Sequence, residues 1–367
     1  AVCGPAYRLL VDGAAQAGDP LAAARRVVAE GGILAVKGIG GFHLACDARN
    51  EAAVQRLRER KSRPQKPFAV MLRDFDAVRR ECRLSDAQKA HLDNHQKPIV
   101  LLEKSGSGKI AASVAPAMPS LGVMLPYTPL HLLLFSLPDE LAAFTDCLVM
   151  TSGNPSGAPI CRTDEDALDA LSSIADLILS HDREIRLRAD DSVMDFYDGA
   201  PYMIRRSRGY APLPLMLSAD FQGSVLGIGG ELKNTFCLAK NSLFYPSPYL
   251  GDMSDLRTLR ALRQALPRME RLLAITPAAV AADLHPRYET SRFAETLGLP
   301  IFKVQHHHAH VLSVMAENDH LSPVIGVSFD GTGYGTDGTI WGGEIMLATT
   351  RDFQRLASLA PFFHAGG

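Results

Sequence analysis

The sequence lacks the features of a membrane, disulfide-rich or secreted protein. Its six cysteines are scattered without a Cys-x-x-Cys pair, which is typical of a protein from a reducing cytoplasm. The longest strongly apolar stretch, Leu130 to Leu137, is interrupted by His131 and Ser136 and is far too short to span a bilayer. Arg8 and Asp12 interrupt the apolar residues near the N-terminus, so no signal peptide is indicated there. We therefore expect a cytoplasmic protein that does not enter a membrane.

Neither sign of charge dominates the chain. It has 38 basic and 40 acidic residues, for a net charge of -2. A protein that coats long nucleic acid is usually basic, so this partner is not expected. Hydrophobic residues make up 47% and charged residues 21% of the sequence, which excludes a disordered or fibrous chain. A length of 367 residues exceeds one ordinary domain and predicts two.

Helix and strand signals alternate along the first half, which favours an α/β fold. Asp19 followed by Pro20 begins a helix, because aspartate accepts free backbone N–H groups and proline suits the first helical position. Ser85 with Gln88 forms a capping-box signature for a later helix. The predicted strands are Ile33–Val36, Phe68–Leu72, Ile99–Leu102 and Leu148–Met150, followed by a hairpin of Val193–Tyr197 with Tyr202–Arg206.

Periodicity weakens near residues 213 to 223, where prolines and Gly223 punctuate the chain, and we place a domain boundary there. Beyond it we predict strands at Val225–Ile228, Phe236–Lys240, Leu243–Tyr245, Val280–Leu284 and Ile301–Val304, with helices over 255–273, over 287–297 and through His310. Two further strands, Val324–Phe329 and Ile340–Ala348, flank a glycine-rich loop.

A basic run from Arg49 to Lys66 is the first candidate binding site. It holds seven basic residues and only two acidic ones. Lys61, Arg63 and Lys66 lie where a helix leads into a strand, and Pro64 and Pro67 stiffen the connection. Three cations on a stiff loop suit a phosphate or carboxylate. The alternative is a solvated basic helix end.

Three other segments follow predicted strands. Lys37–His43 is a glycine-rich turn that lets a backbone approach a ligand closely, or simply a tight turn. Thr151–Gly157 offers hydroxyls and free amides, as nucleotide sites often do. Arg205–Arg208 adds three cations, and a plain solvated strand end is an equal alternative.

Four histidines in five positions, from His306 to His310, form a sharper motif. On a helix, His306 and His310 lie four residues apart on one face, a common arrangement for holding a transition metal. Asp330 ends an apolar strand at the start of a glycine-rich segment that reaches Gly338. A carboxylate at a strand end beside glycines suits metal–nucleotide binding. The alternatives are a mixed set of surface and core histidines, and a glycine-rich hairpin loop.

Together these motifs resemble a known family. Six stretches resemble a YrdC-like domain: Lys37–Asp47, Lys61–Met71, Ser120–His131, Thr151–Ile160, His181–Val193 and Arg205–Pro212. Three more resemble the first half of a carbamoyltransferase domain of the sugar kinase, heat-shock protein and actin type: Gly227–Leu238, Val304–His310 and Asp330–Glu344. In this order they resemble the HypF family of [NiFe]-hydrogenase maturation carbamoyltransferases.

The resemblance implies a fold and a domain plan. Residues 17–215 would form a YrdC-like domain, a twisted mixed sheet with helices. Residues 224–367 would form part of an actin-like, ribonuclease-H-like α/β domain. Cys3 resembles the last cysteine of a zinc-finger pair, so residues 1–16 would be its remnant and linker. The chain would then be a fragment without the family's acylphosphatase domain and without the second half of its transferase domain.

The resemblance also implies an activity. In the family, carbamate released from carbamoyl phosphate is joined to ATP, with Mg²⁺, to give carbamoyl-adenylate. The carbamoyl group then passes to the C-terminal cysteine of the protein HypE and becomes the cyanide ligands of the hydrogenase.

The family's functional residues carry over as follows. Lys61 and Arg63 would be catalytic. A transition metal, iron or zinc, would be held by His306, His310 and Asp330. The positions that would bind the cofactor are Lys37, Lys66, Ser152, Asn154, Arg205 and Arg208. The sequence departs from the family pattern at Tyr249, where a histidine is expected, and no role is carried onto that position.

Three other functions stay open from the sequence. A carbamoyltransferase acting on a small-molecule hydroxyl, or a threonylcarbamoyl-adenylate synthase, would share the first domain's chemistry. A nucleic-acid-binding module using the basic run would instead show affinity that falls steeply with salt and no ATP turnover. The near-neutral net charge counts against that module.

Overall fold

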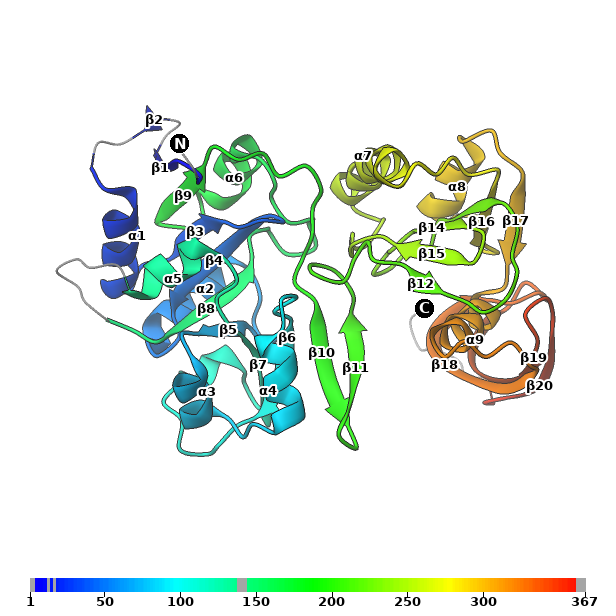
Figure 1. The fold of residues 1–367 in the computed structure, drawn as a ribbon, viewed down its shortest axis with the longest axis horizontal. Helices are drawn as coiled ribbons and strands as arrows, with labels where there is room; N and C mark the ends of the chain where they lie inside the picture. The colour runs from blue at the N-terminus through cyan, green and yellow to red at the C-terminus, as the bar shows by residue number, and fades with distance from the viewer. Residues whose placement is uncertain (1–3, 12–13, 16–17, 137–143, 361–367) are drawn as a thin grey trace. The chain divides into compact units, whose positions relative to one another are not determined.

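The structure is a computed structural model that describes residues 4–11, 14–15, 18–136 and 144–360. The chain divides into two compact units (Figure 1), and each is described by itself. Unit 1 comprises residues 1–211 with 248–250, and unit 2 comprises residues 212–247 and 251–367. The predicted α/β class is confirmed. Cys3 lies outside the described residues, and within them no helix has the length and apolar character needed to cross a membrane.

Unit 1 is built on one mixed sheet, in which eleven described strands follow the order β11-β10-β6-β7-β5-β8-β4-β3-β9-β1-β2. Most neighbours are antiparallel, whereas β3–β9, β5–β7 and β6–β10 are parallel pairs. The strands are β1 (Tyr7–Val11), β2 (Ala14–Ala15), β3 (Leu34–Lys37), β4 (Phe42–Asp47), β5 (Ala69–Leu72), β6 (Ile99–Glu103), β7 (Ser120–Met124), β8 (Cys147–Ser152), β9 (Leu177–His181), β10 (Val193–Tyr197) and β11 (Ala200–Arg205).

Two helices of unit 1 begin at the polar caps that the sequence predicts. The Asp19 side chain accepts from the backbone of α1, whose first residue is Pro20, and the capping box of Ser85 and Gln88 is present at α4. These side chains satisfy backbone N–H groups that the first helical turn leaves free. The helical elements are α1 (Pro20–Ala29), α2 (Glu51–Arg60), α3 (Phe75–Glu81), α4 (Asp86–Asp93), a 3₁₀ turn (Ala112–Val114), α5 (Pro129–Ser136) and α6 (Asp164–Leu171).

Both faces of the unit 1 sheet are covered, so its central strands are apolar throughout. Helices α2, α3, α4 and α6 contribute buried residues to the core on one face. Helices α1 and α5 contribute to the core on the other face. Ser152 is the last residue of β8, whose other five residues are buried, so the polar loop that follows starts directly from the core.

Unit 2 contains two sheets among its described residues, with the strand orders β12-β15-β14-β13-β16-β17 and β18-β19-β20. Strand β16 is parallel to both of its neighbours, and the other pairs are antiparallel. Its elements are β12 (Leu215–Met216), β13 (Ser224–Gly227), β14 (Cys237–Lys240), β15 (Leu243–Pro246), α7 (Leu256–Leu273), β16 (Ala279–Asp283), α8 (Glu289–Glu295), β17 (Ile301–Val304), α9 (His306–Glu317), β18 (Val324–Tyr334), β19 (Ile340–Ala348) and β20 (Phe353–Ser358).

One sequence expectation in unit 2 is wrong. Asp330 does not end its strand, because β18 continues to Tyr334. The pairing of β18 with β19 shifts register between Phe329 and Gly333, which places Asp330 in a β-bulge. A Cβ atom at Gly333 would lie only 2.7 Å from Nδ1 of His307. Glycine at this position thus permits the close approach of β18 to α9. In the sequence, the same glycine is part of a segment that indicates a loop.

Candidate functional site

In unit 1, Lys61 lies at the C-terminal end of α2 and reaches the loop after β8. Its amino group donates to the carbonyl oxygen of Ser152 (2.7 Å) and to Oδ1 of Asn154 (2.9 Å), and it also contacts the Asn154 carbonyl. Ser152 Oγ donates to Asn154 Oδ1 at 2.7 Å. The structure thus brings together three of the residues predicted from separate motifs, and Lys61 fixes the conformation of the loop.

Positive charge accumulates around Lys61. Burial, together with the smaller effects of the charges of Arg63 and Lys66, lowers the pKa of Lys61 to about 7 against the attraction of Asp190. Burial, followed by the charges of Arg58 and Arg205, lowers the pKa of Arg63 to about 10. Lys61 and Arg63 therefore share a partly buried region in which the carboxylate of Asp190 opposes several positive charges, an environment that favours a bound anion.

Arg205 at the end of β11 belongs to the same region. Its Nη1 donates to Asp190 Oδ2 at 2.7 Å, and its guanidinium lies 5.0 Å from the ring centre of Tyr249, which groups with unit 1. Asp190 holds this arginine in place and was not identified from the sequence. The adjacent acidic residues 190 and 191 were the available signal.

Arg208, by contrast, is engaged entirely by the protein. It is buried, and its three nitrogens donate to Asp191 Oδ1 (2.8 Å), Gln96 O and Lys97 O (both 2.9 Å). Asp191 Oδ2 also lies 2.9 Å from Nε2 of His43. Burial raises the pKa of Asp191, but the charges of Arg208 and His43 outweigh it and lower the pKa well below its ordinary value. These contacts give Arg208 a structural role.

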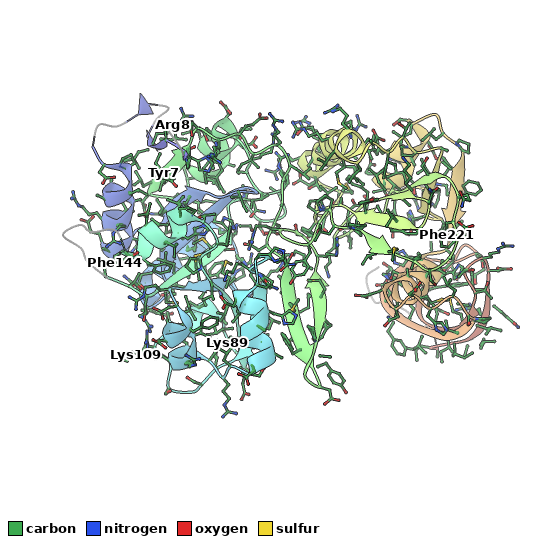
Figure 2. The ribbon with its side chains drawn as sticks, viewed as in Figure 1. Tyr7, Arg8, Lys89, Lys109, Phe144 and Phe221 are labelled. Carbon is green, nitrogen blue, oxygen red and sulfur yellow. The ribbon has the colours of Figure 1, made fainter. Side chains whose placement is uncertain are left out.

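Lys37 is also occupied away from the loop. Its amino group donates to Asp164 Oδ1 at 3.0 Å and to the carbonyl of His181 at 2.9 Å. Asp164 also pairs with Arg8 of β1, which Figure 2 labels, and accepts from Ser180. Lys37 therefore ties β3 to β9 and α6. The prediction that it binds a cofactor receives no support from these contacts.

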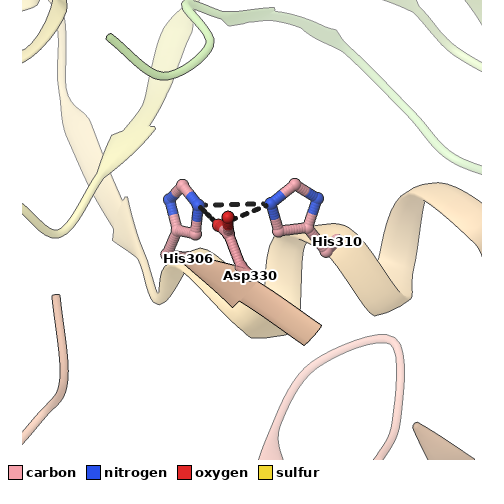
Figure 3. A group of neighbouring side chains, drawn as sticks. All are labelled: His306, His310 and Asp330. Atoms are coloured by element: carbon pink, nitrogen blue, oxygen red, sulfur yellow. Dashed lines mark hydrogen bonds and ion pairs between the residues drawn. The ribbon is translucent and has the colours of Figure 1, made fainter. Parts of the chain in front are cut away.

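Unit 2 holds a compact group of metal-ligating side chains. His306 and His310 lie on one face of α9, and Asp330 projects from the bulge in β18 (Figure 3). The Nε2 atoms of the two histidines are 3.2 Å apart, and Asp330 Oδ2 lies 2.6 Å from His306 Nε2 and 3.4 Å from His310 Nε2. One ligand atom from each residue fits within 4.8 Å of the others. Two imidazoles and a carboxylate form a donor set suited to iron or zinc.

The charges around His306 fit a bound cation. The hydrogen bond to Asp283 raises the pKa of His306, and the charges of Asp283 and Asp330 add to that effect. Burial would raise the pKa of Asp330, but the Gly331 N–H and His306 lower it, so this carboxylate stays ionised. Two carboxylates thus flank one imidazole. Asp283 was not identified from the sequence, although a carboxylate at the end of an apolar strand was a usable signal.

The two intervening histidines have structural partners. His307 Nε2 lies 2.9 Å from the carbonyl of Gly342, and His308 Nε2 lies 2.9 Å from the carbonyl of Thr349. Both histidines are buried. His307 packs against β19, and His308 packs against the turn that follows β19. The motif thus divides into two metal-facing residues and two residues that fasten the helix to the second sheet.

An open cavity adjoins the metal-facing group within unit 2. Its volume is about 610 Å³, and it runs between α9 and β18. His310 and Asp330 belong to its lining, together with apolar residues that include Val314, Val327 and Phe329. A ligand in this cavity would reach His310 and Asp330.

Models of known protein families match the sequences of both units. Residues 26–207 match a family described as "Telomere recombination", and residues 220–317 match the "HypF Kae1-like domain". Residues 326–367 match "Carbamoyltransferase, Kae1-like Domain, second subdomain". "Carbamoyltransferase HypF" of Rhizobium leguminosarum bv. viciae is 44% identical over 90% of this chain and 44% of that protein. The protein of that name from Rhodobacter capsulatus is 44% identical over 100% of this chain and 49% of its own length.

Solved structures of HypF proteins also match this chain. Full-length HypF in its phosphate- and nucleotide-bound form matches with a TM-score of 0.89 and 43% identity, over 96% of this chain and 46% of that one. HypF of T. kodakarensis matches with a TM-score of 0.90 and 42% identity, over 97% of this chain and 47% of that one. The chain spans about half the length of the curated relatives it matches. It belongs to the HypF family, with a YrdC-like first unit and a Kae1-like second unit.

Proposed function

We propose that this chain carries out ATP-dependent steps of carbamoyl transfer in [NiFe]-hydrogenase maturation. In unit 1, carbamate derived from carbamoyl phosphate is adenylated by ATP. Unit 2 then participates in transfer of the carbamoyl group to the C-terminal cysteine of HypE. The names of the relatives support the transfer activity, and the phosphate- and nucleotide-bound relative supports nucleotide use.

The excess of cations around Lys61 is the observation that carries this proposal. Lys61, Arg63 and Arg205 gather beside Asp190, and the exposed Lys66 adds a further positive charge to the region. Buried like charges lower one another's pKa and destabilise the free site. A triphosphate supplies several negative charges, so its binding would relieve this repulsion.

The residues present suit an adenylation reaction. A carbamate oxygen attacks the α-phosphorus of ATP, and the bond to the β-phosphate breaks to release pyrophosphate. Lys61 and Arg63 would neutralise charge that builds on the phosphate oxygens, and Mg²⁺ would accompany the nucleotide. Ser152 and Asn154 would contact the nucleotide from the loop after β8. Because carbamate is a weak nucleophile, positioning supplies much of the acceleration.

In the second step, the thiolate sulfur of the acceptor attacks the carbamoyl carbon, and AMP leaves as the S–C bond forms. His306, His310 and Asp330 would hold iron or zinc beside the open cavity of unit 2. Such a cation supplies Lewis-acid stabilisation of a phosphate or carbonyl oxygen. The apolar wall of that cavity would exclude water, which competes with the thiol for the activated carbamoyl group.

ATP–pyrophosphate exchange tests the first step. The full 367-residue chain should exchange label between pyrophosphate and ATP when carbamate or bicarbonate is present, without a requirement for threonine. Lys61→Met should lower the exchange rate about 100-fold, because one charge contact to the transition state is lost. Lys109→Met is the matched control, since Lys109 is an exposed lysine of unit 1 (Figure 2) and its loss should leave the rate unchanged.

Each other outcome has a distinct meaning. A requirement for threonine would move the chain to threonylcarbamoyl-adenylate synthesis. Binding of nucleic acid that weakens steeply with salt, without exchange, would favour the nucleic-acid-binding alternative. An unchanged rate in Lys61→Met would remove Lys61 from the catalytic site.

A further inference from the structure

The two ring nitrogens of His306 face different partners. Nε2 faces Asp330 Oδ2 at 2.6 Å and His310 Nε2 at 3.2 Å, inside the metal-ligating group (Figure 3). Nδ1 lies 2.7 Å from Oδ2 of Asp283, outside that group. Because an imidazole presents its lone pair on one nitrogen when the other carries hydrogen, the partner of Nδ1 decides what Nε2 can do.

Asp283 is held firmly before it meets His306. It is the last residue of β16 and pairs with Val304 of β17. Its Oδ1 accepts from the backbone N–H of His285 at 2.8 Å, and its side chain is 7% exposed. The carboxylate therefore has one orientation, with Oδ2 directed at the imidazole.

Asp283 lies behind His306, outside the metal-ligating group. One of its oxygens is bound to the His285 N–H and the other faces Nδ1 of His306. Asp283 is not part of the metal-ligating group. That group consists of His306, His310 and Asp330, whose ligand atoms lie within 4.8 Å of one another. A carboxylate behind a metal-binding imidazole fixes the ring and increases the basicity of its other nitrogen.

We propose that Asp283 is a positioning residue that holds His306 with hydrogen on Nδ1 and so directs the Nε2 lone pair to the metal. This inference rests on the proposed metal centre and adds a residue to it. His310 is 55% exposed, and no comparable carboxylate contacts its Nδ1 in the described part of the chain. The two histidines are therefore unequal, and His306 is the pre-oriented ligand.

Zinc binding to the full chain tests the proposal, with Zn²⁺ alone as the probe in competition with a chromophoric chelator. Asp283→Ala should weaken Zn²⁺ binding about 10- to 100-fold, the effect typical of a lost carboxylate behind a metal-bound histidine. Asp255→Ala is the matched control. Asp255 accepts from the backbone N–H two residues later at 2.8 Å, as Asp283 does, and it contacts no histidine in the described residues.

A second readout separates positioning from a general loss of structure. Because Asp330 also faces Nε2 in the metal-free chain, the readout is taken in the Asp330→Ala background, where Asp283 is the carboxylate left beside the ring. Nitrogen-15 NMR of metal-free Asp330→Ala, at a pH where His306 is neutral, should show hydrogen on Nδ1. When Asp283→Ala is added, the hydrogen should move toward Nε2 while the circular dichroism spectrum stays the same. If that variant does not fold, Asp283→Asn replaces it. Asparagine can still accept from the His285 N–H, but it then presents an NH₂ group to Nδ1, so the same weakening is expected.

Two results would overturn the inference in different ways. If a folded Asp283 variant binds Zn²⁺ as tightly as the wild type, and loss of Asp283 in the Asp330→Ala background leaves the His306 tautomer unchanged, Asp283 is removed from the site and the metal centre stays intact. A wild-type chain that binds Zn²⁺ no more tightly than His306→Ala would remove the metal centre itself, and the role of Asp283 with it.

Discussion

Replacement of Asp191 by asparagine should destabilise unit 1 strongly. The carboxylate is 4% exposed and lies between Nε of Arg208 (2.8 Å) and Nε2 of His43 (2.9 Å). Arg208 is itself 7% exposed, so its charge would remain buried without its acidic partner. Breaking a buried ion pair by removing one partner costs about 3 to 5 kcal/mol. The two backbone carbonyls that also accept from Arg208 cannot neutralise its charge.

The single tryptophan allows each unit to be observed separately. Trp341 lies in β19 and is 3% exposed, so its fluorescence reports the unfolding of unit 2. Far-UV circular dichroism reports both units. With a urea m-value of about 3 kcal/mol per molar for a unit of this size, the loss should lower the midpoint of the unit 1 transition by roughly 1 to 2 M. The tryptophan transition should stay where it is.

The pH dependence gives a second test with a defined sign. The pKa of Asp191 lies below its ordinary value, so its ionised form contributes stability above about pH 4 that is lost as the pH falls further. The difference in free energy of unfolding between the wild type and Asp191→Asn should therefore begin to shrink below about pH 4, and it should keep shrinking as the pH falls toward the depressed pKa of Asp191.

The matched control for this prediction is Asp198→Asn, an exposed aspartate at the β10–β11 turn. Its φ of 49° is a conformation that asparagine also adopts. A midpoint shift in Asp191→Asn no larger than in this control would refute the reasoning.

Two further predictions concern the proposed sites. Because burial lowers the pKa of Lys61 to about 7, ATP binding at pH 8 should raise that pKa and take up part of a proton. Calorimetry in buffers of different ionisation enthalpy measures this uptake, and its persistence in Lys61→Met would contradict the assignment. In unit 2, His306→Ala should remove bound Zn²⁺, whereas His308→Ala should retain it and lose stability, because His308 contacts the Thr349 carbonyl; equal zinc loss in both would contradict this division.

Local features of the fold are predictable from the sequence because their causes are local. The helix predicted over 255–273 is observed as α7 with Asp255 as its cap, and the hairpin about Asp198 is observed between β10 and β11. Capping and turn formation depend on side chains within a few residues of one another. The contact of Lys61 with the loop after β8 could be expected only because the basic run and the Thr151–Gly157 segment each indicated binding of a phosphate-bearing ligand.

Pairing across long sequence distances is not predictable in this way. Lys37 and Arg208 are both predicted to bind a cofactor, and their ion pairs with Asp164 and Asp191 could not be predicted from the sequence. Whether a cation binds a ligand or the protein depends on which carboxylate the tertiary fold places beside it. The bulge at Asp330 also depends on distant parts of the chain. Its register is set by β19 and by the close packing of α9, and not by the glycines alone.

Local charge balance separates the structural clusters from the proposed binding sites. Around Arg208, the positive guanidinium is matched by Asp191, whose other oxygen faces His43. Around Lys61 positive charge is in excess, whereas around His306 two carboxylates flank one imidazole. Buried charges are costly unless they are paired, so each imbalance favours a ligand of the opposite sign. By this reasoning unit 1 is built to receive an anion and unit 2 a cation, which are the two ligands that the proposed transfer of a carbamoyl group from an adenylate requires.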